Sequence, residues 1–334
     1  MKAIVYSTKT FEKELLAKAN LKKHDITLIS NPLNIQTVSY AEGKDAVVVL
    51  SNDDLSAPVI DRLAKYGIKY ISTRGAYVEN INRRAAAKYG MKIARVPSSP
   101  EAVAEHVLTL VLALNRKLVK AVKRSSDFDF NLDGLTGFNL HGKTIGLIGY
   151  DCVGEYTAKI FNNLGCRVLV TDESLKADPQ GAQLVDLDTL YQESDIISLH
   201  LPFKNNINYI INRESISKMK NGVMLINTSR GGLLDTSSVL EALKSGKLGY
   251  LGADVYENES GLLFENDPGS SFRDPILQEL LQLPNVIITP HLASLTKESL
   301  EEIARQTIKN LDNWQAGKCV GKACACANDC ATKH

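Results

Sequence analysis

The sequence predicts an α/β protein built from doubly wound parallel sheets, and two observations support this prediction. Short apolar runs of strand length alternate along the chain with segments whose apolar residues recur at helical spacing. This alternation is typical of parallel strands joined by helices that cover both faces of a sheet. The chain also has 334 residues, of which 44% are hydrophobic and 23% charged, and this size and composition suit two globular domains.

The overall charge and hydropathy argue against several classes of partner. The net charge of +1 gives no general attraction to nucleic acid or to an anionic membrane, so neither partner is expected. The apolar run at residues 1–6 is too short for a signal peptide and is typical of an opening strand. No stretch approaches the roughly 18 uninterrupted apolar residues of a membrane-spanning helix, and we expect a cytoplasmic protein.

The first part of the chain predicts one set of alternating elements. Strands are expected at residues 3–6, 25–28, 46–50 and 70–72, and helices at 11–21 and 57–66. The sequence PSSP at residues 97–100 breaks this pattern and predicts a hinge. One long helix is expected at residues 101–124, where Val103, Val107 and Leu110 recur at helical spacing. Its many apolar residues predict burial against a partner chain, with an ordinary interdomain helix as the alternative.

The most informative stretch is residues 143–172, KTIGLIGYDCVGEYTAKIFNNLGCRVLVTD. An apolar strand leads into a glycine turn at 149–154, then a helix at 155–163, then a second buried strand that ends at Asp172. This order is that of a dinucleotide-binding, Rossmann-like βαβ unit. The turn would present backbone N–H groups to a pyrophosphate. Asp172 would accept hydrogen bonds from a ribose diol, which favours NAD over NADP.

The glycine motif of this turn is incomplete. The pattern G-x-G-x-x-G would begin at Gly149 and end at Gly154, but Asp151 stands where the middle glycine belongs. An aspartate adds both a Cβ and a charge, and two unit charges about 5 Å apart repel by about 3 kcal/mol at an effective dielectric near 20. We therefore expect weakened pyrophosphate binding, and a purely structural βαβ unit is the alternative.

Three side chains with catalytic potential follow the ends of later predicted strands. Strands are expected at 196–199, 223–226, 251–255 and 286–288, helices at 237–243 and 297–314, and a long loop at 261–274. Arg230, Glu259 and His291 each come shortly after such a strand. Because ligands bind at the carboxyl ends of parallel strands, these side chains can converge although they lie far apart in sequence.

The chemistry of the three residues suits hydride transfer between a 2-hydroxy acid and a 2-keto acid beside a nicotinamide. The guanidinium of Arg230 binds a carboxylate through two parallel hydrogen bonds. An imidazole generally titrates near neutrality, so the side chain of His291 can pass a proton to or from a hydroxyl. The carboxylate of Glu259 favours the protonated imidazole and fixes its tautomer. Each residue also has a structural alternative, as a packed loop histidine, a capping arginine or a solvated glutamate.

The sequence around these residues resembles the D-isomer-specific 2-hydroxyacid dehydrogenases, closest to the D-lactate dehydrogenase branch of that family. The resemblance runs from the first strand to residue 317 and is strongest in five motifs. They are PEAVAEH at 100–106, LHGKT at 140–144, NTSRGG at 227–232, DVYENE at 254–259 and TPH at 289–291.

The resemblance implies two Rossmann-like, or flavodoxin-like, doubly wound domains, with the cofactor domain inserted into the substrate domain. Residues 1–99 and 297–334 would form the substrate domain, and residues 100–296 the NAD-binding domain. It implies NAD as cofactor and reversible reduction of a small 2-keto acid, with pyruvate to D-lactate as the leading reaction. It also implies a homodimer formed through the 101–124 helix.

The resemblance assigns a role to each site residue. Arg230 would bind the substrate carboxylate, His291 would be the acid/base, and Glu259 would orient and charge His291. Cofactor contacts are implied for Gly149, Asp151, Cys152, Val153, Gly154 and Asp172, for Leu201, Pro202, Thr228 and Ser229 at the nicotinamide end, and for Asp254, which would also support His291. Ala76 and Tyr77 would belong to a loop whose backbone N–H groups receive the substrate carboxylate.

The chain departs from the family pattern at several of these positions, which gives a second hypothesis. Besides Asp151, Cys152 stands where a basic residue is common, Tyr77 replaces a glycine, and Ile207 replaces a Thr or Asn near the cofactor. Ser294 replaces an aromatic residue of the lactate branch. The alternative function is therefore a catalytically weakened or non-catalytic family member with a binding or regulatory role.

The last segment, residues 318–334, lies outside the resemblance. It contains Cys319, Cys324, Cys326 and Cys330, followed by the terminal His334. These are soft metal ligands, but their spacing matches no zinc pattern. We expect a flexible tail of thiols with no metal.

Overall fold

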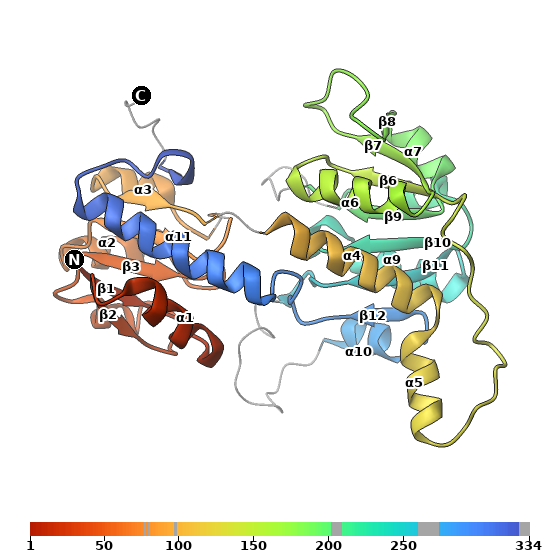
Figure 1. Ribbon diagram of the computed structural model, residues 1–334, viewed down its shortest axis with the longest axis horizontal. Coiled ribbons are helices and arrows are strands. Elements are labelled where there is room, and N and C mark those ends of the chain that lie inside the picture. Colours follow the sequence, from red (N-terminus) through yellow and green to blue (C-terminus); the bar gives the residue numbers. More distant parts are fainter. Residues whose placement is uncertain (77, 79, 97–98, 202–208, 260–273, 327–334) are drawn as a thin grey trace. The chain divides into compact units, whose positions relative to one another are not determined.

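The computed structural model describes residues 1–76, 78, 80–96, 99–201, 209–259 and 274–326. The chain forms two compact units, residues 1–99 with 295–334 and residues 100–294 (Figure 1). The chain was predicted to re-enter the first unit at residue 297, and in the structure it does so at residue 295. Several predictions fall outside the described residues, namely those for Tyr77, Pro97, Ser98, Pro202, Ile207, Cys330, His334 and the loop up to residue 273.

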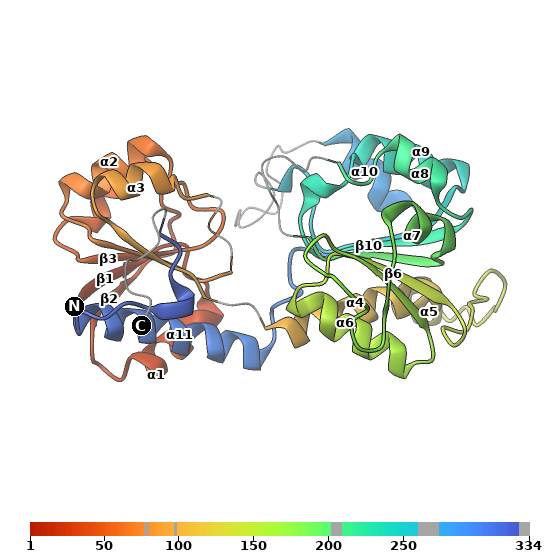
Figure 2. The same cartoon turned by 90° about the horizontal axis from the view of Figure 1, so that it is seen from above.

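The first unit contains a five-stranded parallel sheet in the order β2-β1-β3-β4-β5. Its strands are β1 Lys2–Val5, β2 Asp25–Leu28, β3 Ala46–Val49, β4 Tyr70–Thr73 and β5 Lys92–Ala94. Its helices are α1 Thr10–Asn20, α2 Ala57–Lys65, α3 Arg83–Lys88 and α11 Lys297–Gln315, with 3-10 turns η1 Val38–Ala41 and η4 Gly321–Ala323. Helices α2 and α3 lie on one face of the sheet and α1 and α11 on the other (Figure 2). The sequence does not predict the short elements α3 and β5.

Helix α11 belongs to this unit because its apolar stripe fits a row of small residues on the sheet. Its buried side chains Ile308, Leu311 and Trp314 cluster with Ala3, Ala46 and Ala94 of three strands. The Trp314 ring also stacks on Tyr70 of β4, with ring centroids 4.8 Å apart. The alanines leave the volume that the large helix side chains fill at interior packing density.

The second unit contains a seven-stranded parallel sheet in the order β12-β11-β10-β9-β6-β7-β8. Its strands are β6 Thr144–Ile148, β7 Arg167–Thr171, β8 Gln183–Leu184, β9 Ile196–Leu199, β10 Val223–Asn227, β11 Leu248–Ala253 and β12 Val286–Ile288. Its helices are α4 Pro100–Asn115, α5 Leu118–Ser126, α6 Cys152–Asn163, α7 Leu187–Glu193, α8 Arg213–Lys218, α9 Thr236–Ser245 and α10 Pro275–Gln282, with the 3-10 turn η2 Gly231–Leu233. The predicted α/β class with doubly wound parallel sheets is confirmed.

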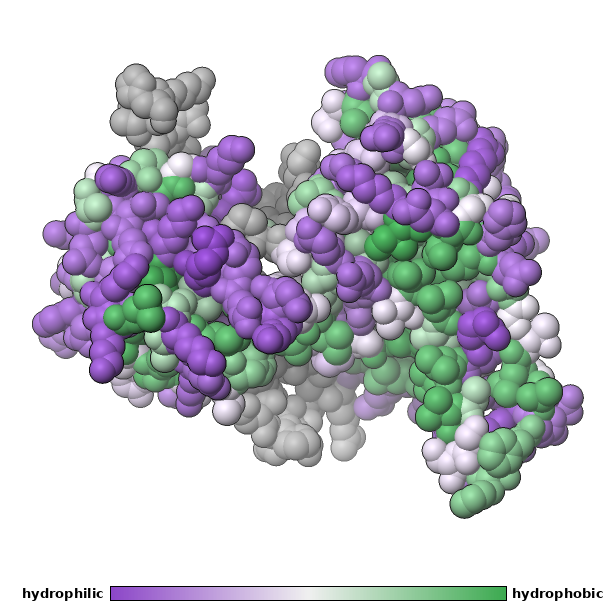
Figure 3. Space-filling view, in the orientation of Figure 1, coloured by the Kyte–Doolittle hydropathy of each residue, from purple (hydrophilic) through white to green (hydrophobic). Residues whose placement is uncertain are grey.

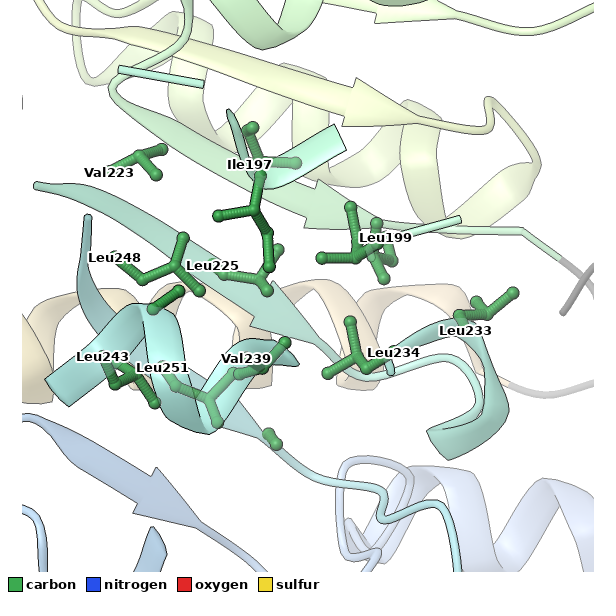
Figure 4. Packing of buried hydrophobic residues seen from close by; sticks show 14 of the residues in the cluster. Ile197, Leu199, Val223, Leu225, Leu233, Leu234, Val239, Leu243, Leu248 and Leu251 are labelled. Carbon is green, nitrogen blue, oxygen red and sulfur yellow. The ribbon is translucent and has the colours of Figure 1, made fainter. Parts of the chain in front are cut away.

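Successive residues of one strand serve opposite faces of the second sheet, as the strand period of two requires. Leu225 of β10 packs with Val239 and Leu243 of α9 (Figure 4). Its neighbours Met224 and Ile226 join the cluster beneath α4 and α6. Both faces of the sheet are therefore covered by helices. The carboxyl ends of the strands are not covered in this way, so a site can form there.

The predicted helix at residues 101–124 is wrong in one respect, because it breaks into α4 and α5. Lys117, between them, adopts a left-handed conformation with φ of 51°. The Asn115 side chain donates to the Phe138 carbonyl and accepts from the Phe138 N–H, at 2.7 and 2.8 Å. Lys117 Nζ lies 4.1 Å from the centre of the Tyr250 ring. These tertiary contacts end α4, and the apolar periodicity gives no sign of them.

The C-terminal segment differs from the predicted flexible tail over its described part. The Ala325 N–H donates to the Ile93 carbonyl at 2.9 Å, and the Arg95 N–H donates to the Ala323 carbonyl at 2.8 Å. The Cys326 Sγ accepts from the Ile93 N–H at 3.3 Å. An edge strand exposes unpaired backbone groups, and residues 323–326 satisfy those of β5. Within the described residues no three His, Cys, Asp or Glu side chains are grouped as metal ligands.

Candidate active site

His291 and Glu259 lie together at the carboxyl edge of the second sheet, beyond β12 and β11. The His291 Nδ1 is 3.1 Å from the Glu259 Oε1. The other carboxylate oxygen accepts from the Tyr256 N–H at 3.0 Å, which fixes the orientation of the carboxylate. The imidazole is 30% exposed and the glutamate 24% exposed. With Nδ1 directed at the carboxylate, Nε2 is the ring nitrogen that could exchange a proton with a ligand.

Asp254, at the end of β11, holds the backbone around His291. Its carboxylate accepts from Thr289 Oγ1, from the Leu292 N–H and from the Ala293 N–H, at 2.5, 2.9 and 2.8 Å. Its carbonyl accepts from the His291 N–H at 2.9 Å. His291 has a φ of 53°, a left-handed conformation that costs a non-glycine residue free energy unless its surroundings impose it. Asp254 is only 1% exposed and supports this loop. The cofactor contact that the resemblance also implies for Asp254 stays a prediction.

His106 of α4 completes the support of the loop, and the sequence reasoning missed it. Its Nε2 lies 3.1 Å from Thr289 Oγ1 and 3.4 Å from Asp254 Oδ1. Burial alone would raise the pKa of Asp254, but the hydrogen bonds from His106, Thr289 and two backbone N–H groups outweigh it and lower the pKa. Asp254 is therefore charged at neutral pH. The only sequence signal for His106 was its place in the motif PEAVAEH.

Arg230 lies in a tight turn after β10 that packs against the loop of Glu259. The Asn227 side chain ties this turn together, because it donates to the Arg230 carbonyl at 2.8 Å and accepts from the Ser229 N–H at 3.0 Å. A Cβ on Gly231 would stand 2.1 Å from the Tyr256 carbonyl, so only glycine permits this approach. Arg230 Nη1 donates to the Ser229 carbonyl at 2.7 Å. The structure thus places the Arg230 turn directly beside the segment that carries Glu259.

The glycine turn after β6 and the acid after β7 form the other half of the site. Gly149 has a φ of 97°, and a Cβ there would stand 2.6 Å from the His200 carbonyl oxygen. The Asp172 carboxylate accepts from the Tyr150 N–H at 2.7 Å and from the Ser174 N–H at 2.8 Å. The acid that would hold an adenosine ribose is therefore fixed beside the turn that would hold the phosphates.

Asp151 adopts a role that its sequence position did not predict. Its Oδ1 accepts from the Val153 and Gly154 N–H groups, each at 3.0 Å, so it is the N-cap of α6. Helix α6 consequently begins at Cys152, three residues before the predicted start. Burial raises the pKa of Asp151; the two backbone hydrogen bonds oppose this effect, and the charge of Asp172 adds to it.

His200 is a second residue that the sequence reasoning did not assign to the site. It follows β9, is 2% exposed, and packs behind the glycine turn. Neither ring nitrogen has a hydrogen-bond partner within the described residues. Burial lowers the pKa of His200 to about 3, so the imidazole is neutral.

The resemblance implies Leu201, Thr228 and Ser229 for the nicotinamide end, and all three lie within the described residues. Leu201 is half-buried beside Gly149, and Ser229 donates to the Leu199 carbonyl at 2.9 Å. Thr228 Oγ1 is buried.

The loop predicted to receive the substrate carboxylate belongs to the first unit. It is anchored by Arg74, which is buried, donates to the Tyr6 carbonyl at 3.0 Å and lies 3.2 Å from a Glu12 carboxylate oxygen. The Gly75 carbonyl accepts from Thr73 Oγ1 at 2.6 Å, and Ala76 is half-buried. Arg74 is therefore occupied in holding the loop.

The residues of the second unit fit an NAD molecule, with one departure. Gly149 lies so close to the His200 carbonyl that no Cβ would fit in this turn, and Asp172 beside the turn would accept hydrogen bonds from a ribose. Both lie at the carboxyl edge that also carries His291 and Arg230. The departure is Asp151, whose carboxylate already occupies two N–H groups of the helix N-terminus.

Comparison with known proteins agrees with this site. Residues 108–293, wholly within the second unit, match the family described as D-isomer specific 2-hydroxyacid dehydrogenase, NAD binding domain. The chain is 42% identical over 322 residues to a D-lactate dehydrogenase of Escherichia coli, covering 95% of this chain and 98% of the relative. It is 42% identical over 324 residues to D-lactate dehydrogenase kk1H of Curvularia clavata, covering 95% and 93%.

Solved structures give the same result. The pyruvate reductase of Chlamydomonas reinhardtii superposes with a TM-score of 0.89 at 40% identity, covering 96% of this chain and 98% of that one. Apo D-lactate dehydrogenase of Escherichia coli superposes with a TM-score of 0.87 at 40% identity, covering 96% and 99%. The chain therefore belongs to the family of D-isomer-specific 2-hydroxyacid dehydrogenases, whose matched domain binds NAD.

Proposed function

We propose that the protein is an NAD-dependent D-2-hydroxyacid dehydrogenase that reversibly reduces pyruvate to D-lactate. The observation that carries the proposal is the His291–Glu259 pair, 3.1 Å apart at the edge of the sheet that bears the dinucleotide turn. The relatives that are named D-lactate dehydrogenase and pyruvate reductase support pyruvate as the substrate.

Each side chain has one task in the proposed reaction. The glycine turn and Asp172 would hold NAD, which would supply the hydride that is exchanged with the substrate C2. Arg230 binds the substrate carboxylate, because a guanidinium offers two parallel N–H donors. During reduction the protonated His291 gives its Nε2 proton to the carbonyl oxygen, which leaves a hydroxyl and a neutral imidazole. Glu259 stabilises the imidazolium before transfer, and Asp254 fixes the backbone that carries the ring.

A second candidate function is a weakened or non-catalytic family member with a binding or regulatory role. Asp151 favours it, because its carboxylate occupies N–H groups that a pyrophosphate would take. The His291–Glu259 pair opposes it, because a binding module has no need of an oriented acid/base.

One experiment separates the two functions. NADH oxidation is followed by absorbance with a panel of 2-keto acids, and NADH binding is titrated in parallel by fluorescence. The proposed enzyme oxidises NADH with pyruvate faster than with bulkier 2-keto acids. Binding of NADH without turnover on any member of the panel would favour the second function.

We also propose a homodimer formed through α4, α5 and the residues after them. Helix α5 has no buried residue, and Val119 and Val122 on it are 62% and 58% exposed. Phe128 and Phe130, which follow it, are 88% and 73% exposed. Figure 3 shows that apolar residues gather on the surface over α4 and α5. A continuous apolar surface of this kind is typical of a protein interface.

The dimer is tested by light scattering after gel filtration. The native chain should have twice the mass of one chain. Val119→Asp with Val122→Asp should give a monomer, because two charges would be buried unpaired in the interface. The control, Lys159→Asp on α6, should leave the mass unchanged. A monomeric native chain would contradict the proposal.

The proposed location is the cytoplasm, where NADH and 2-keto acids are available together. None of the described helices is both long and apolar enough to cross a membrane. Fractionation of the source cells, with the protein followed by antibody, tests the location.

A further inference from the structure

The helix N-terminus at the dinucleotide turn is already occupied by an anion that belongs to the chain. The Asp151 Oδ1 accepts from the Val153 and Gly154 N–H groups, each at 3.0 Å. The Asp151 backbone is extended, with φ of −77° and ψ of −170°, as an N-cap residue requires. The first N–H groups of a helix have no acceptor within the helix, so the carboxylate satisfies two of them.

A pyrophosphate at a βαβ turn uses the same kind of donor. It binds at the helix N-terminus through backbone N–H groups and is favoured there by the helix dipole. The cap takes the Val153 N–H, one of the groups that the family resemblance assigns to the pyrophosphate. One N–H points in one direction, so it cannot give a full hydrogen bond to a carboxylate and a phosphate at once.

The charge around the turn adds to this conflict. The Asp172 carboxylate accepts from the Tyr150 N–H at 2.7 Å, immediately before Asp151 in the chain. Burial and the charge of Asp172 raise the pKa of Asp151, whereas its hydrogen bonds to α6 lower it. The turn thus holds two carboxylates before any cofactor arrives, and only one of them, Asp172, has a use in binding a ribose.

We propose that Asp151 discriminates against pyrophosphate ligands as an internal competitor, so that NADH binds only when α6 exchanges the Asp151 carboxylate for phosphate oxygens. The inference rests on the proposed function, which places the pyrophosphate at this turn. Competition has two separable parts, the hydrogen bonds of the cap and the repulsion between negative charges. Ligands without phosphate meet neither part.

Two substitutions separate these parts. Asp151→Asn keeps a side-chain oxygen for the cap, since Asn is as good an N-cap residue as Asp, but removes the charge. Asp151→Ala removes both the cap and the charge. Loss of repulsion should tighten NADH binding by about tenfold or more in Asp151→Asn. This figure is lower than the roughly hundredfold that corresponds to the repulsion of two unit charges about 5 Å apart. Loss of the cap should tighten NADH binding by about fivefold further in Asp151→Ala.

The measurement is fluorescence titration of the purified full-length apo protein with NADH, with adenosine as a phosphate-free probe. Adenosine affinity should be the same in all three proteins. Thermal unfolding of the apo proteins gives a second readout. Asp151→Asn should keep the native midpoint, whereas Asp151→Ala should lower it by about 2–4 °C, because a helix cap is lost in a unit of this size.

A matched control comes from another N-cap in the same unit. Asp186 caps α7 by accepting from the Thr189 N–H at 2.8 Å. Asp186→Ala should lower the midpoint in the same way and leave NADH affinity unchanged. A gain in affinity with Asp186→Ala would show that looser helices bind better in general, and that would overturn the proposal.

The remaining outcomes each decide a specific point. Equal NADH affinity in Asp151→Asn and Asp151→Ala would show that the cap does not compete, and the proposal would fall. Ordinary NADH affinity in the native chain with no gain in either variant would overturn it as well, with the proposed dehydrogenase function intact. Absence of NADH binding in every protein would overturn both.

Discussion

The His291 N–H donates to the Asp254 carbonyl at 2.9 Å, while the Asp254 carboxylate holds the two residues that follow His291. A single buried aspartate therefore holds the backbone of the proposed acid/base residue and of the two residues that follow it. Glu259 determines the ring through its contact with Nδ1. The backbone and the ring of His291 are thus oriented by separate carboxylates, and this separation can be tested.

Asp254→Asn should lower kcat for pyruvate reduction by about tenfold or more. The amide keeps one acceptor oxygen but brings an NH₂ group against a backbone N–H, and each buried donor left unsatisfied costs about 1–3 kcal/mol. NADH affinity should change little, because the dinucleotide turn is not touched. Steady-state kinetics with parallel NADH titration check this expectation. A normal kcat would show that the loop around His291 keeps its conformation without the Asp254 carboxylate.

His106 should act through the same loop, as a positioning residue. His106→Leu should lower kcat, because Thr289 Oγ1 and Asp254 lose the group that Nε2 provides. His106→Gln should restore most of the activity, since its side-chain nitrogen reaches the position of Nε2. His106→Asn is too short to do so and serves as the control. Equal activity in the Gln and Asn variants would argue that His106 only fills space.

His291→Ala should abolish pyruvate reduction and leave NADH affinity nearly unchanged, because the proton donor is lost and the cofactor turn is intact. Glu259→Gln should retain only a small part of the activity, because the amide leaves His291 Nδ1 without its carboxylate partner. Steady-state kinetics with parallel NADH titration check both variants, and a normal kcat in Glu259→Gln would separate the two residues functionally.

Arg230→Lys should lower kcat/KM for pyruvate by about tenfold to a hundredfold. The lysine keeps the charge but loses the two-point geometry, and a hydrogen bond to a charged group contributes roughly 1.5–3 kcal/mol. The comparison with a 2-keto compound that lacks the carboxylate is the control, since its slow turnover should not depend on residue 230. Near-normal kcat/KM with pyruvate would mean that the carboxylate is bound elsewhere.

The sequence predicted the parts of this site that depend on strand ends. Apolar runs located β6, β9, β10, β11 and β12, and parallel strands bring their carboxyl ends to one edge. Glu259 and His291 were paired on chemical grounds, and the structure brings them within 3.1 Å. By contrast, nothing in the sequence indicates that His106 reaches Thr289 or that His200 packs behind Gly149. Those contacts depend on how elements that are far apart in the sequence pack against each other. The local sequence around one residue does not specify this packing.

Asp151 shows a different kind of error. An aspartate before an apolar helical stretch is among the strongest signals for a helix start. The glycine motif instead predicts a helix start after Gly154 and treats Asp151 only as an added Cβ and an added charge. The structure shows that its side chain satisfies the first N–H groups of α6. The rule for helix caps, had it been applied to Asp151, would have placed the start of α6 correctly.

The last prediction concerns His200 and the pH dependence of stability. The unfolded imidazole takes up a proton below its ordinary pKa of 6.5, whereas in the folded state burial lowers the pKa of His200 to about 3. Between these values the unfolded chain binds more protons, so folding stability is complete above pH 6.5 and falls as the pH falls toward 3. The loss should be about 1 kcal/mol per pH unit from this one residue.

The urea midpoint of the native chain, measured at a series of pH values below neutrality, should fall more steeply than that of His200→Met. Methionine fills a similar volume, carries no titrating group, and leaves no buried ring nitrogen to satisfy. The exposed His141 supplies the control, because His141→Met should keep the native slope. If His200→Met keeps the native slope too, the imidazole is hydrated or protonated in the folded protein, and the neutral buried histidine behind the dinucleotide turn is refuted.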